Sequence, residues 1–265
     1  MRNLRRTLVV ALVASLALVM AGCGDSDDTT SAGGSSTSSA AITGTITVFA
    51  AASLTESFTA LGKSFEAAHP GTKVTFSFGP SSGLAEQITQ GAPADVFASA
   101  SKKNMTQVSD AGDAANPQDF AKNVMEIAVP PSNPAKVTGV DDLARSGVKV
   151  ALCQAAVPCG TVAAQVFTNA GITVKPVTEE ADVKAVLAKV TLGEVDAGMV
   201  YVTDVKSAGD KVAGVEIPAD VNASTSYPIA ALKGSKNAAT AQAFVDYVLS
   251  PTGTAALTAA GFQAP

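Results

Sequence analysis

The polar groups best placed to do chemistry lie at four joints, where a predicted strand ends or a predicted helix begins. These joints are Ser53 after a strand over residues 45–50, Ser81 and Ser82 after a strand over 74–78, residues 157–160 before a helix over 160–169, and residues 180–183 at the start of a helix over 181–191. The first turn of a helix has backbone N–H groups without intrahelical acceptors. In open parallel sheets, ligands bind beyond the carboxyl ends of the strands. Helix ends that converge there would bind an anion without any Lys or Arg.

Each of these features also has a purely structural interpretation. Ser53, with Glu56 three residues later, has the spacing of a capping box. Serines at helix starts are commonly N-caps that bind nothing else. Tyr201, at the end of a strand over residues 197–201, can serve packing alone. The pattern by itself therefore leaves both interpretations open.

Catalysis by Ser53 or Ser81 is an alternative from another class of protein, an exported hydrolase. A serine nucleophile needs a general base within hydrogen-bond reach. The chain has one histidine, His69, at the far end of the helix that follows Ser53. A helix of about 15 residues is about 22 Å long, so His69 is badly placed for either serine. We therefore expect a binding protein rather than an enzyme, with no catalytic residue.

The composition excludes several other functions. The chain has 265 residues with 18 Lys and Arg, 23 Asp and Glu, and a formal net charge of −5. Nucleic-acid binding needs clustered Lys and Arg, which an acidic chain does not favour. One His and at most two Cys in the mature chain leave no His/Cys cluster for a structural zinc site. The hydrophobic share of 47% and the length suffice for one large domain or two medium ones.

Residues 1–22 have the composition of a lipoprotein signal peptide. A basic start is followed by the uncharged apolar run 8–20, which is shorter than the roughly 20 residues of a membrane-spanning helix. The tetrapeptide Met-Ala-Gly-Cys at residues 20–23 resembles the bacterial lipobox. We expect Cys23 to carry lipid and to anchor the exported protein to the outer face of the cell membrane. A plain signal peptide followed by an incidental Cys is the alternative.

Residues 23–42 predict a flexible tether, because Ser, Thr, Gly and Ala dominate and large apolar residues are almost absent. Removal of residues 1–22 takes away three arginines and no acid, which changes the formal charge from −5 to −8. Cys153 and Cys159 then remain, six residues apart. In an oxidising compartment such a pair favours a disulfide, and two reduced thiols are the alternative.

Strand and helix patterns alternate from residue 45 onward. Leu54, Phe58, Leu61 and Phe65 recur on one helical face between the first two strands. A helix from Leu84 and strands over 95–98, 125–129, 148–152 and 197–201 continue the series, and the last predicted helix carries residues 243–248. This order predicts an α/β fold with mostly parallel sheets flanked by helices.

Two long runs, ITVFAAASLT at residues 46–55 and GAPADVF at residues 91–97, resemble signatures of the bacterial molybdate-binding proteins, the solute-binding components of molybdenum ABC transporters. Between them, FGPSSGLAEQI at residues 78–88 is similar to the serine-bearing turn and helix of that family. Shorter matches follow in the family's order, and these are residues 157–160, 182–183, 198–201, 227–230 and 261–262. The resemblance covers residues 44–263.

The resemblance implies a two-lobed periplasmic-binding-protein fold of type II, with the ligand in the cleft between the lobes. It implies lobe I over residues 43–123 plus 226–265 and lobe II over residues 124–225. It also implies that a tetrahedral oxyanion is bound by hydrogen bonds alone, so molybdenum has no direct protein ligand. The implied donors are Ser53, Ser81, Cys159, Val183 and Tyr201.

Two departures from the family bear on that site. The family commonly has a small residue such as Ala where this chain has Cys159, and a backbone donor survives that change. It commonly has Ser where this chain has Pro80, which removes one hydroxyl and one N–H. Ser82 therefore stays open as an alternative ligand to Ser81.

The function that the resemblance implies is capture of molybdate, and also of tungstate, for delivery to an ABC transporter permease. It implies no cofactor, a monomer, contact with the membrane through the N-terminal lipid, and no nucleic-acid partner. A receptor for another oxyanion such as sulfate is the alternative within the same class.

Overall fold

Three parallel strands begin the fold, and their sequences explain why. The computed structural model describes residues 42–265. Ile46 and Val48 of the first strand are fully buried, as β-branched residues on the inner face of a sheet are. Ala51 lies opposite Gly79 of the second strand, so the carboxyl ends of these two strands lie side by side. The elements of this region are β1 (Gly44–Ala51), η1 (Ala52–Leu54), α1 (Thr55–Ala68), β2 (Thr72–Gly79), α2 (Ser81–Thr89), β3 (Val96–Ala98) and α3 (Lys102–Asp110).

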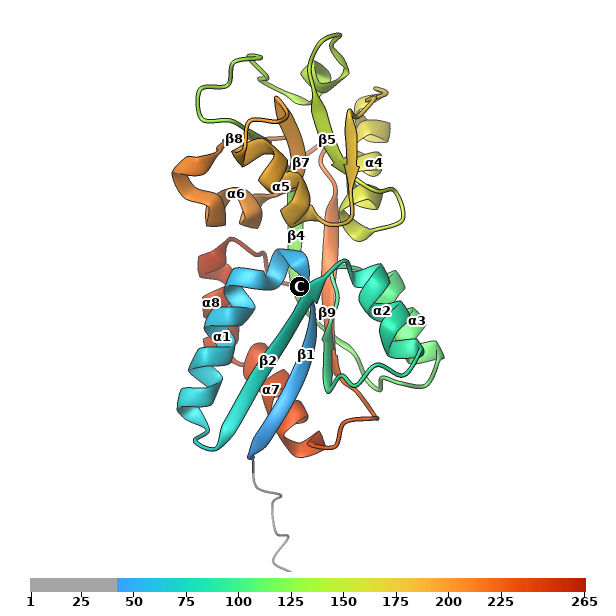
Figure 1. The fold of residues 1–265 in the computed structure, drawn as a ribbon, viewed down its shortest axis with the longest axis vertical. Coiled ribbons are helices and arrows are strands. Elements are labelled where there is room, and N and C mark those ends of the chain that lie inside the picture. The colour runs from blue at the N-terminus through green and yellow to red at the C-terminus, as the bar shows by residue number, and fades with distance from the viewer. Residues whose placement is uncertain (1–41) are drawn as a thin grey trace, which may run out of the picture. The chain divides into compact units, whose positions relative to one another are not determined.

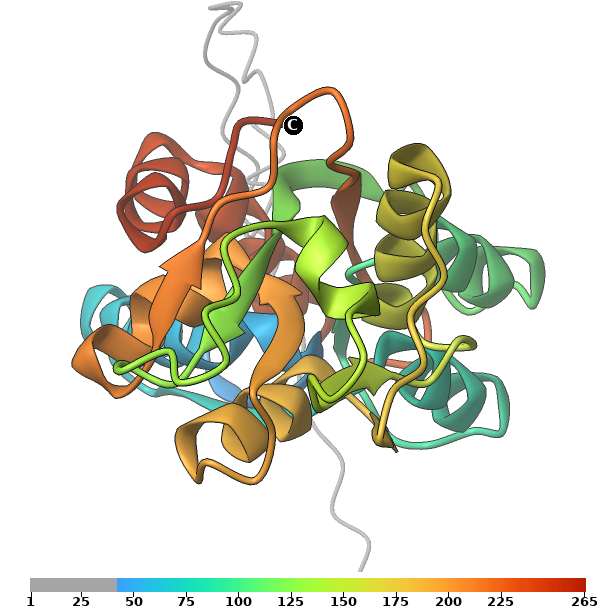
Figure 2. The ribbon, with the colours of Figure 1, turned by 90° about the horizontal axis from the view of Figure 1, so that it is seen from above.

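A second group of three parallel strands, with helices packed against them, follows later in the chain. Its middle strand pairs in parallel with a strand on each side, and helices pack against the strands. Seen from above, α4 and α5 lie on different sides of these strands (Figure 2). The elements of this region are η2 (Val140–Ala144), β5 (Val150–Cys153), α4 (Pro158–Ala170), β6 (Thr178–Glu180), α5 (Val183–Thr191), β7 (Ala197–Tyr201), α6 (Val202–Ala208) and η3 (Gly209–Lys211).

One long strand joins the two groups. It pairs antiparallel with β9 from Gln118 to Val124 and with β7 from Met125 to Ala128. The sheet order is β2-β1-β3-β9-β4-β7-β5-β6, with β8 beside β4. The joining strand and the remaining elements are β4 (Gln118–Val129), β8 (Ala213–Val215), β9 (Ser224–Ala231), α7 (Ala238–Leu249) and α8 (Pro251–Ala260).

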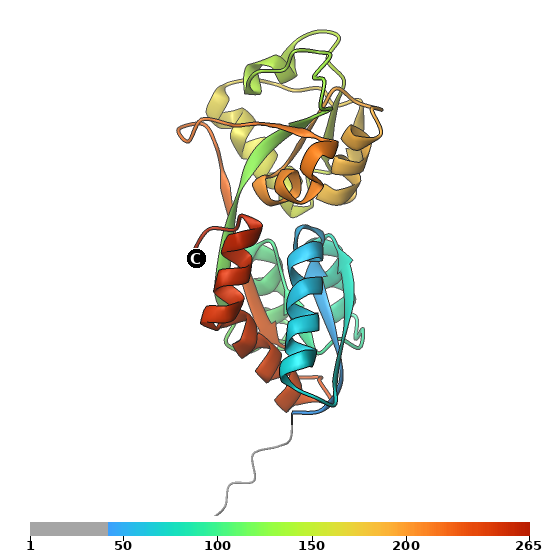
Figure 3. The ribbon, with the colours of Figure 1, turned by 90° about the vertical axis from the view of Figure 1, so that its left-hand side faces the viewer.

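The fold has two lobes (Figures 1 and 3), and each contains buried apolar clusters. We call lobe I the part built on β1–β3 and lobe II the part built on β5–β7. The core of lobe I contains Phe58, Phe65 and Phe244, whose rings pack edge to face. The core of lobe II draws its buried residues from the range 125–217, with Ala52 of η1 as the single addition from lobe I.

The predicted alternation of strands and helices is confirmed, and three details differ. Four antiparallel pairs, all involving β4 or β9, accompany the predicted parallel ones. A further helix, α8, follows the predicted last helix, because Ser250 caps a new start just before Pro251. Glu180, placed by the sequence at a helix start, lies in β6, and Asp182 caps α5 instead.

No helix within residues 42–265 is long and apolar enough to cross a membrane. Cys23, the predicted signal peptide of residues 1–22 and the predicted tether up to residue 41 lie outside the described residues.

The start of α4 is fixed by a close approach between backbones. A Cβ atom at Gly160 would lie 2.0 Å from the carbonyl oxygen of Gln154 and 2.8 Å from that of Cys153. Only glycine allows this approach. A disulfide between Cys153 and Cys159 joins the end of β5 to the same turn, with the Cα atoms 5.8 Å apart. The first turn of α4 is therefore held against the end of β5 by two devices.

We predict that Gly160→Ala destabilises the protein. Overpacking costs about 1–3 kcal/mol, and the loss exceeds the gain in helix propensity of about 1 kcal/mol, because the opposing atoms are backbone. The net loss is up to about 2 kcal/mol, so the melting temperature should fall by up to roughly 8 °C. Gly234→Ala is the control, because a Cβ atom there meets nothing within 4 Å. Equal melting temperatures for the two variants would contradict the close approach.

Candidate functional site

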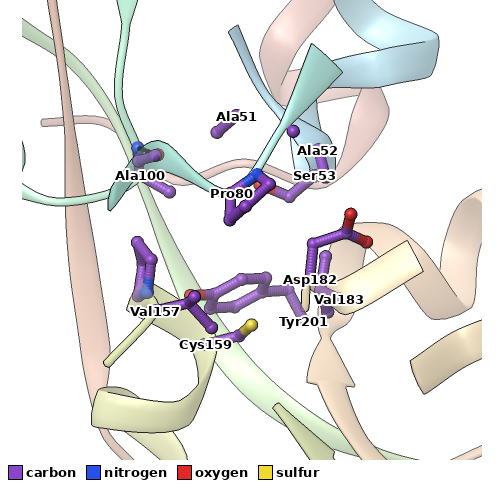
Figure 4. A pocket seen from close by; sticks show the side chains of 13 residues that line it. Ala51, Ala52, Ser53, Pro80, Ala100, Val157, Cys159, Asp182, Val183 and Tyr201 are labelled. Atoms are coloured by element: carbon purple, nitrogen blue, oxygen red, sulfur yellow. Dashed lines mark hydrogen bonds between the residues drawn. The ribbon is translucent and has the colours of Figure 1, made fainter. Parts of the chain in front are cut away.

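The candidate site is a small pocket between the two lobes (Figure 4). Lobe I provides the ends of β1 and β2 and the chain after β3, and lobe II provides the starts of α4 and α5 and the end of β7. The residues that line it are Ala51, Ala52, Ser53, Gly79, Pro80, Ser81, Ala100, Val157, Pro158, Cys159, Asp182, Val183 and Tyr201. The four joints that the sequence singled out therefore meet at one place.

The structure brings five of the predicted residues together and leaves one out. Ser53, Ser81, Cys159, Val183 and Tyr201 all line the pocket, and each is at most 5% exposed. Ser82, the alternative to Ser81, is the next residue of α2 and is absent from the lining. The turn between β2 and α2 therefore places Ser81, and not Ser82, at the cavity.

Ser53 lies in η1, the single turn between β1 and α1. Its predicted role as N-cap of the following helix is wrong, because Leu54 is the N-cap of α1 and no side chain bonds there. The Ser53 hydroxyl instead lies 2.8 Å from the hydroxyl of Tyr227 on β9, a buried hydrogen bond. Because the Ser53 side chain does not cap a helix, its hydroxyl can take part in the pocket.

Ser81 is the first residue of α2, and Pro80 is the N-cap. The Ser81 Oγ accepts a hydrogen bond of 2.9 Å from the backbone N–H of Ala100. A serine hydroxyl that accepts one bond through its oxygen still has a proton to donate. Ser81 therefore offers the pocket both a hydroxyl proton and an amide of a first helical turn.

Cys159 and Val183 contribute backbone amides from lobe II. Cys159 follows the N-terminal Pro158 of α4, and the disulfide to Cys153 engages its side chain. Val183 is the first residue of α5, where the Asp182 carboxylate accepts from the amides of Lys184 and Ala185 at 2.9 and 3.0 Å. Because Asp182 occupies the next two amides, the Val183 N–H is left for a ligand.

Tyr201 provides a buried phenol. Its hydroxyl oxygen is inaccessible to water and has no hydrogen-bond partner in the described part of the chain. Buried polar groups are nearly always paired, so a hydroxyl that lines a pocket without a protein partner is free to bond to a ligand. Burial first, and then the neighbouring Tyr227 and Asp204, raise the pKa of Tyr201 well above its ordinary value. The phenol therefore stays protonated and can donate.

Two residues had no role at the site assigned to them from the sequence. Tyr227, which bonds Ser53, lies some 170 positions away from it along the chain, and only the pairing of β9 with β3 and β4 brings it near. Ala100 contributes only a backbone amide, which no residue type signals. His69 ends α1, stacks on Phe65, and is not among the lining residues.

The charges and the volume of the pocket determine which kind of ligand it can bind. The lining contains no Lys or Arg, and its one carboxylate, on Asp182, accepts two helix amides through Oδ1. The cavity leaves about 20 Å³ for the centre of a water-sized sphere, and one water needs about 10–15 Å³ on the same measure. Within residues 42–265, no three His, Cys, Asp or Glu side chains lie close enough to hold a metal ion. The pocket suits one small ligand that accepts hydrogen bonds on several sides.

Comparison with known proteins gives a consistent picture. Residues 46–263 match the family model described as bacterial extracellular solute-binding protein. The molybdate-binding protein ModA of Mycobacterium tuberculosis is 44% identical over 221 residues, which cover 83% of this chain and 85% of that protein.

Two solved structures are similar as well. The substrate-binding domain of a putative molybdenum ABC transporter from Clostridium difficile is 31% identical, with a TM-score of 0.65 over 84% of this chain and all of that one. The periplasmic molybdate-binding protein of Azotobacter vinelandii has a TM-score of 0.74 at 22% identity, over 83% and 99% of the two chains. By its sequence match over nearly all of the described residues, this chain belongs to the family of bacterial extracellular solute-binding proteins.

Proposed function

We propose that this protein captures molybdate, and also tungstate, outside the cytoplasm and delivers it to an ABC transporter permease. One observation carries the proposal: neutral donors from both lobes line one small pocket without Lys or Arg. The molybdate-binding relatives reported above support the same ligand. Ser53 and Ser81 donate through hydroxyl and amide groups, Cys159 and Val183 through amides, and Tyr201 through its phenol. No cofactor takes part, and the ion is the cargo.

The physics of a buried dianion supports this donor set. Removing a charged group from water without compensation is very costly. Hydrogen bonds to a charged group contribute about 1.5–3 kcal/mol each, and several of them offset that cost. The starts of α2, α4 and α5 add the positive ends of three helix dipoles. A pocket made of such groups attracts negative charge although the chain as a whole is acidic.

Donor-only sites also discriminate between anions. A protonated anion such as hydrogen phosphate brings a hydrogen that needs an acceptor, and a ring of donors has none to offer. Sulfate carries no such proton, so size alone separates it from the larger molybdate and tungstate. Octahedral binding of tungstate needs several carboxylate ligands, and the lining has one, on Asp182, whose Oδ1 already caps α5.

An exported hydrolase finds no support in the geometry. The hydroxyl of Ser53 bonds Tyr227, and that of Ser81 bonds a backbone amide. Neither partner is a general base. The family is one of solute-binding proteins and not of enzymes.

We further infer the organisation of the mature chain. The lobe boundaries at 43–123 plus 226–265 and 124–225 are supported by the change of partner strand along β4 after Val124. The bonded pair Cys153 and Cys159 suits an exported protein. The mature chain is a monomer held at the outer face of the membrane by a lipid on Cys23.

Calorimetric titration with four anions tests the function. We predict tight binding of molybdate and tungstate, and weak or undetectable binding of sulfate and phosphate, because only the first two fill the pocket without bringing a proton. Preference for sulfate or phosphate, or no heat with any of the four, would contradict the proposal.

Alanine variants of the serines test the donor set. Ser53→Ala and Ser81→Ala each remove one charge-assisted hydrogen bond, so affinity for molybdate should fall by about 10- to 100-fold. Ser82→Ala is the matched control, from the same helix turn but outside the lining, and it should bind as the wild type does. Far-ultraviolet circular dichroism checks that all three fold. If Ser82→Ala alone lowered the affinity, the donor would be Ser82 and the assignment of Ser81 would be wrong.

A further inference from the structure

One ion pair stands apart from the others in residues 42–265. The pairs of Lys73, Lys102, Arg145 and Lys189 each stay within one lobe. Lys184 of α5 in lobe II instead reaches Glu56 of α1 in lobe I, with 2.7 Å between Nζ and Oε2. It is the single ion pair in this part of the chain that crosses between the lobes. Figure 1 shows α5 above the start of α1, and η1 contacts α5.

Lys184 also holds a second carboxylate. Its Nζ lies 3.0 Å from Oδ1 of Asp204 in α6 and 3.3 Å from the hydroxyl of Ser207. The Asp204 side chain is fully buried, Lys184 is 22% exposed and Glu56 is 54% exposed. The ammonium group therefore bridges a buried acid of lobe II and a half-exposed acid of lobe I.

Both carboxylates are tied to residues of the pocket. The other oxygen of Asp204 accepts a hydrogen bond of 3.0 Å from the backbone N–H of Tyr201. Glu56 lies three residues after Ser53, in the first turn of α1. Lys184 itself directly follows Val183, and its backbone N–H donates a hydrogen bond to the capping carboxylate of Asp182. The bridge thus spans the cleft immediately beside the donor ring.

We propose that Lys184 is a positioning residue of the oxyanion site, and that its bridge between Asp204 and Glu56 stabilises the closed arrangement in which the donors of the two lobes face one another. This inference rests on the proposed function. Lys184 does not contact the pocket and is absent from its lining. It acts by holding Ser53 and Ser81 at the distance from Val183 and Tyr201 that one ion can span.

The charges favour such a bridge. Burial lowers the pKa of Lys184, but Asp204 and Glu56 outweigh it, so that the pKa is raised and the ammonium keeps its charge. Burial raises the pKa of Asp204, and Lys184 opposes the change. A buried carboxylate needs its cation in place, so Asp204 keeps Lys184 beside the cleft when the lobes separate. Closure then adds Glu56 to a cation that is already oriented.

The effect of Glu56→Gln on molybdate binding distinguishes a bridging role of Glu56 from simple repulsion between Glu56 and the anion. If the Glu56 charge only repelled the anion, Glu56→Gln would tighten binding. If Glu56 holds the lobes together, Glu56→Gln weakens binding through faster dissociation. We expect the molybdate dissociation rate to rise about two- to fivefold, the range that ion pairs exposed to solvent give. The mature chain loaded with molybdate and chased with excess tungstate provides this rate.

Two further variants complete the set. Lys184→Arg keeps the charge, so its molybdate dissociation rate should stay within about twofold of the wild-type rate. Lys184→Met should dissociate molybdate faster than Glu56→Gln does, because it also leaves the Asp204 carboxylate without its cation. Glu194→Gln is the matched control, because it removes an acid paired with a lysine of the same helix, entirely within lobe II. It should dissociate molybdate as the wild type does. Added salt should speed dissociation from the wild type more than from Glu56→Gln.

A measurement without ligand keeps the two proposals separate. Small-angle X-ray scattering of the ligand-free mature chain should give a larger radius of gyration for Glu56→Gln than for the wild type and Glu194→Gln. If the wild type binds no molybdate, the proposed function fails while this comparison still decides on the bridge. Unchanged scattering, or tighter molybdate binding by Glu56→Gln, would overturn the role of Lys184.

Discussion

A doubly charged anion removed from water must meet hydrogen-bond donors on all sides, and this constraint organises the structure. A lysine or arginine in the pocket would supply charge from one direction only. Backbone amides at helix starts supply partial charge from fixed directions and need no reorganisation. The starts of α2, α4 and α5 line the pocket with such amides, and Ser53, Ser81 and Tyr201 line it with hydroxyls. The acidic net charge of the chain is compatible with this site, because net charge acts at long range and the donors act at contact.

The two-lobed fold follows from the same constraint. One sheet edge presents donors to one side of an ion, and a second edge is needed for the other. Lobe I and lobe II each turn the carboxyl ends of parallel strands toward the cleft, and β4 and β9 connect them as antiparallel strands. Apart from Ala52, which packs into the core of lobe II, the buried apolar residues of each core come from one lobe, so separation of the lobes exposes little of either core. Contacts that cross the cleft, such as Lys184 with Glu56 and Ala52 in the core of lobe II, then decide how firmly the closed form is held.

Much of the fold was predictable from local pattern, and the reasons are physical. Periodicity located β1, α1 and β2, because buried faces repeat every two or 3.6 residues. Pattern located the four joints at strand ends and helix starts, whereas the choice of Ser53, Ser81, Cys159, Val183 and Tyr201 among their residues came from the family resemblance. The capping role given to Ser53 failed since the turn η1 intervenes before α1. Contacts between distant segments, such as Ser53 with Tyr227 and Lys184 with Glu56, leave no trace in local spacing and required the structure.

Neutral protein donors around an intact tetrahedral oxyanion leave a measurable signature in the molybdate complex. X-ray absorption at the molybdenum edge detects it, because it counts the atoms bound to the metal. We expect four oxygen neighbours at one short distance, as in free molybdate, and no protein ligand in the first coordination sphere. Six-coordinate molybdenum with longer bonds to protein carboxylates would contradict it.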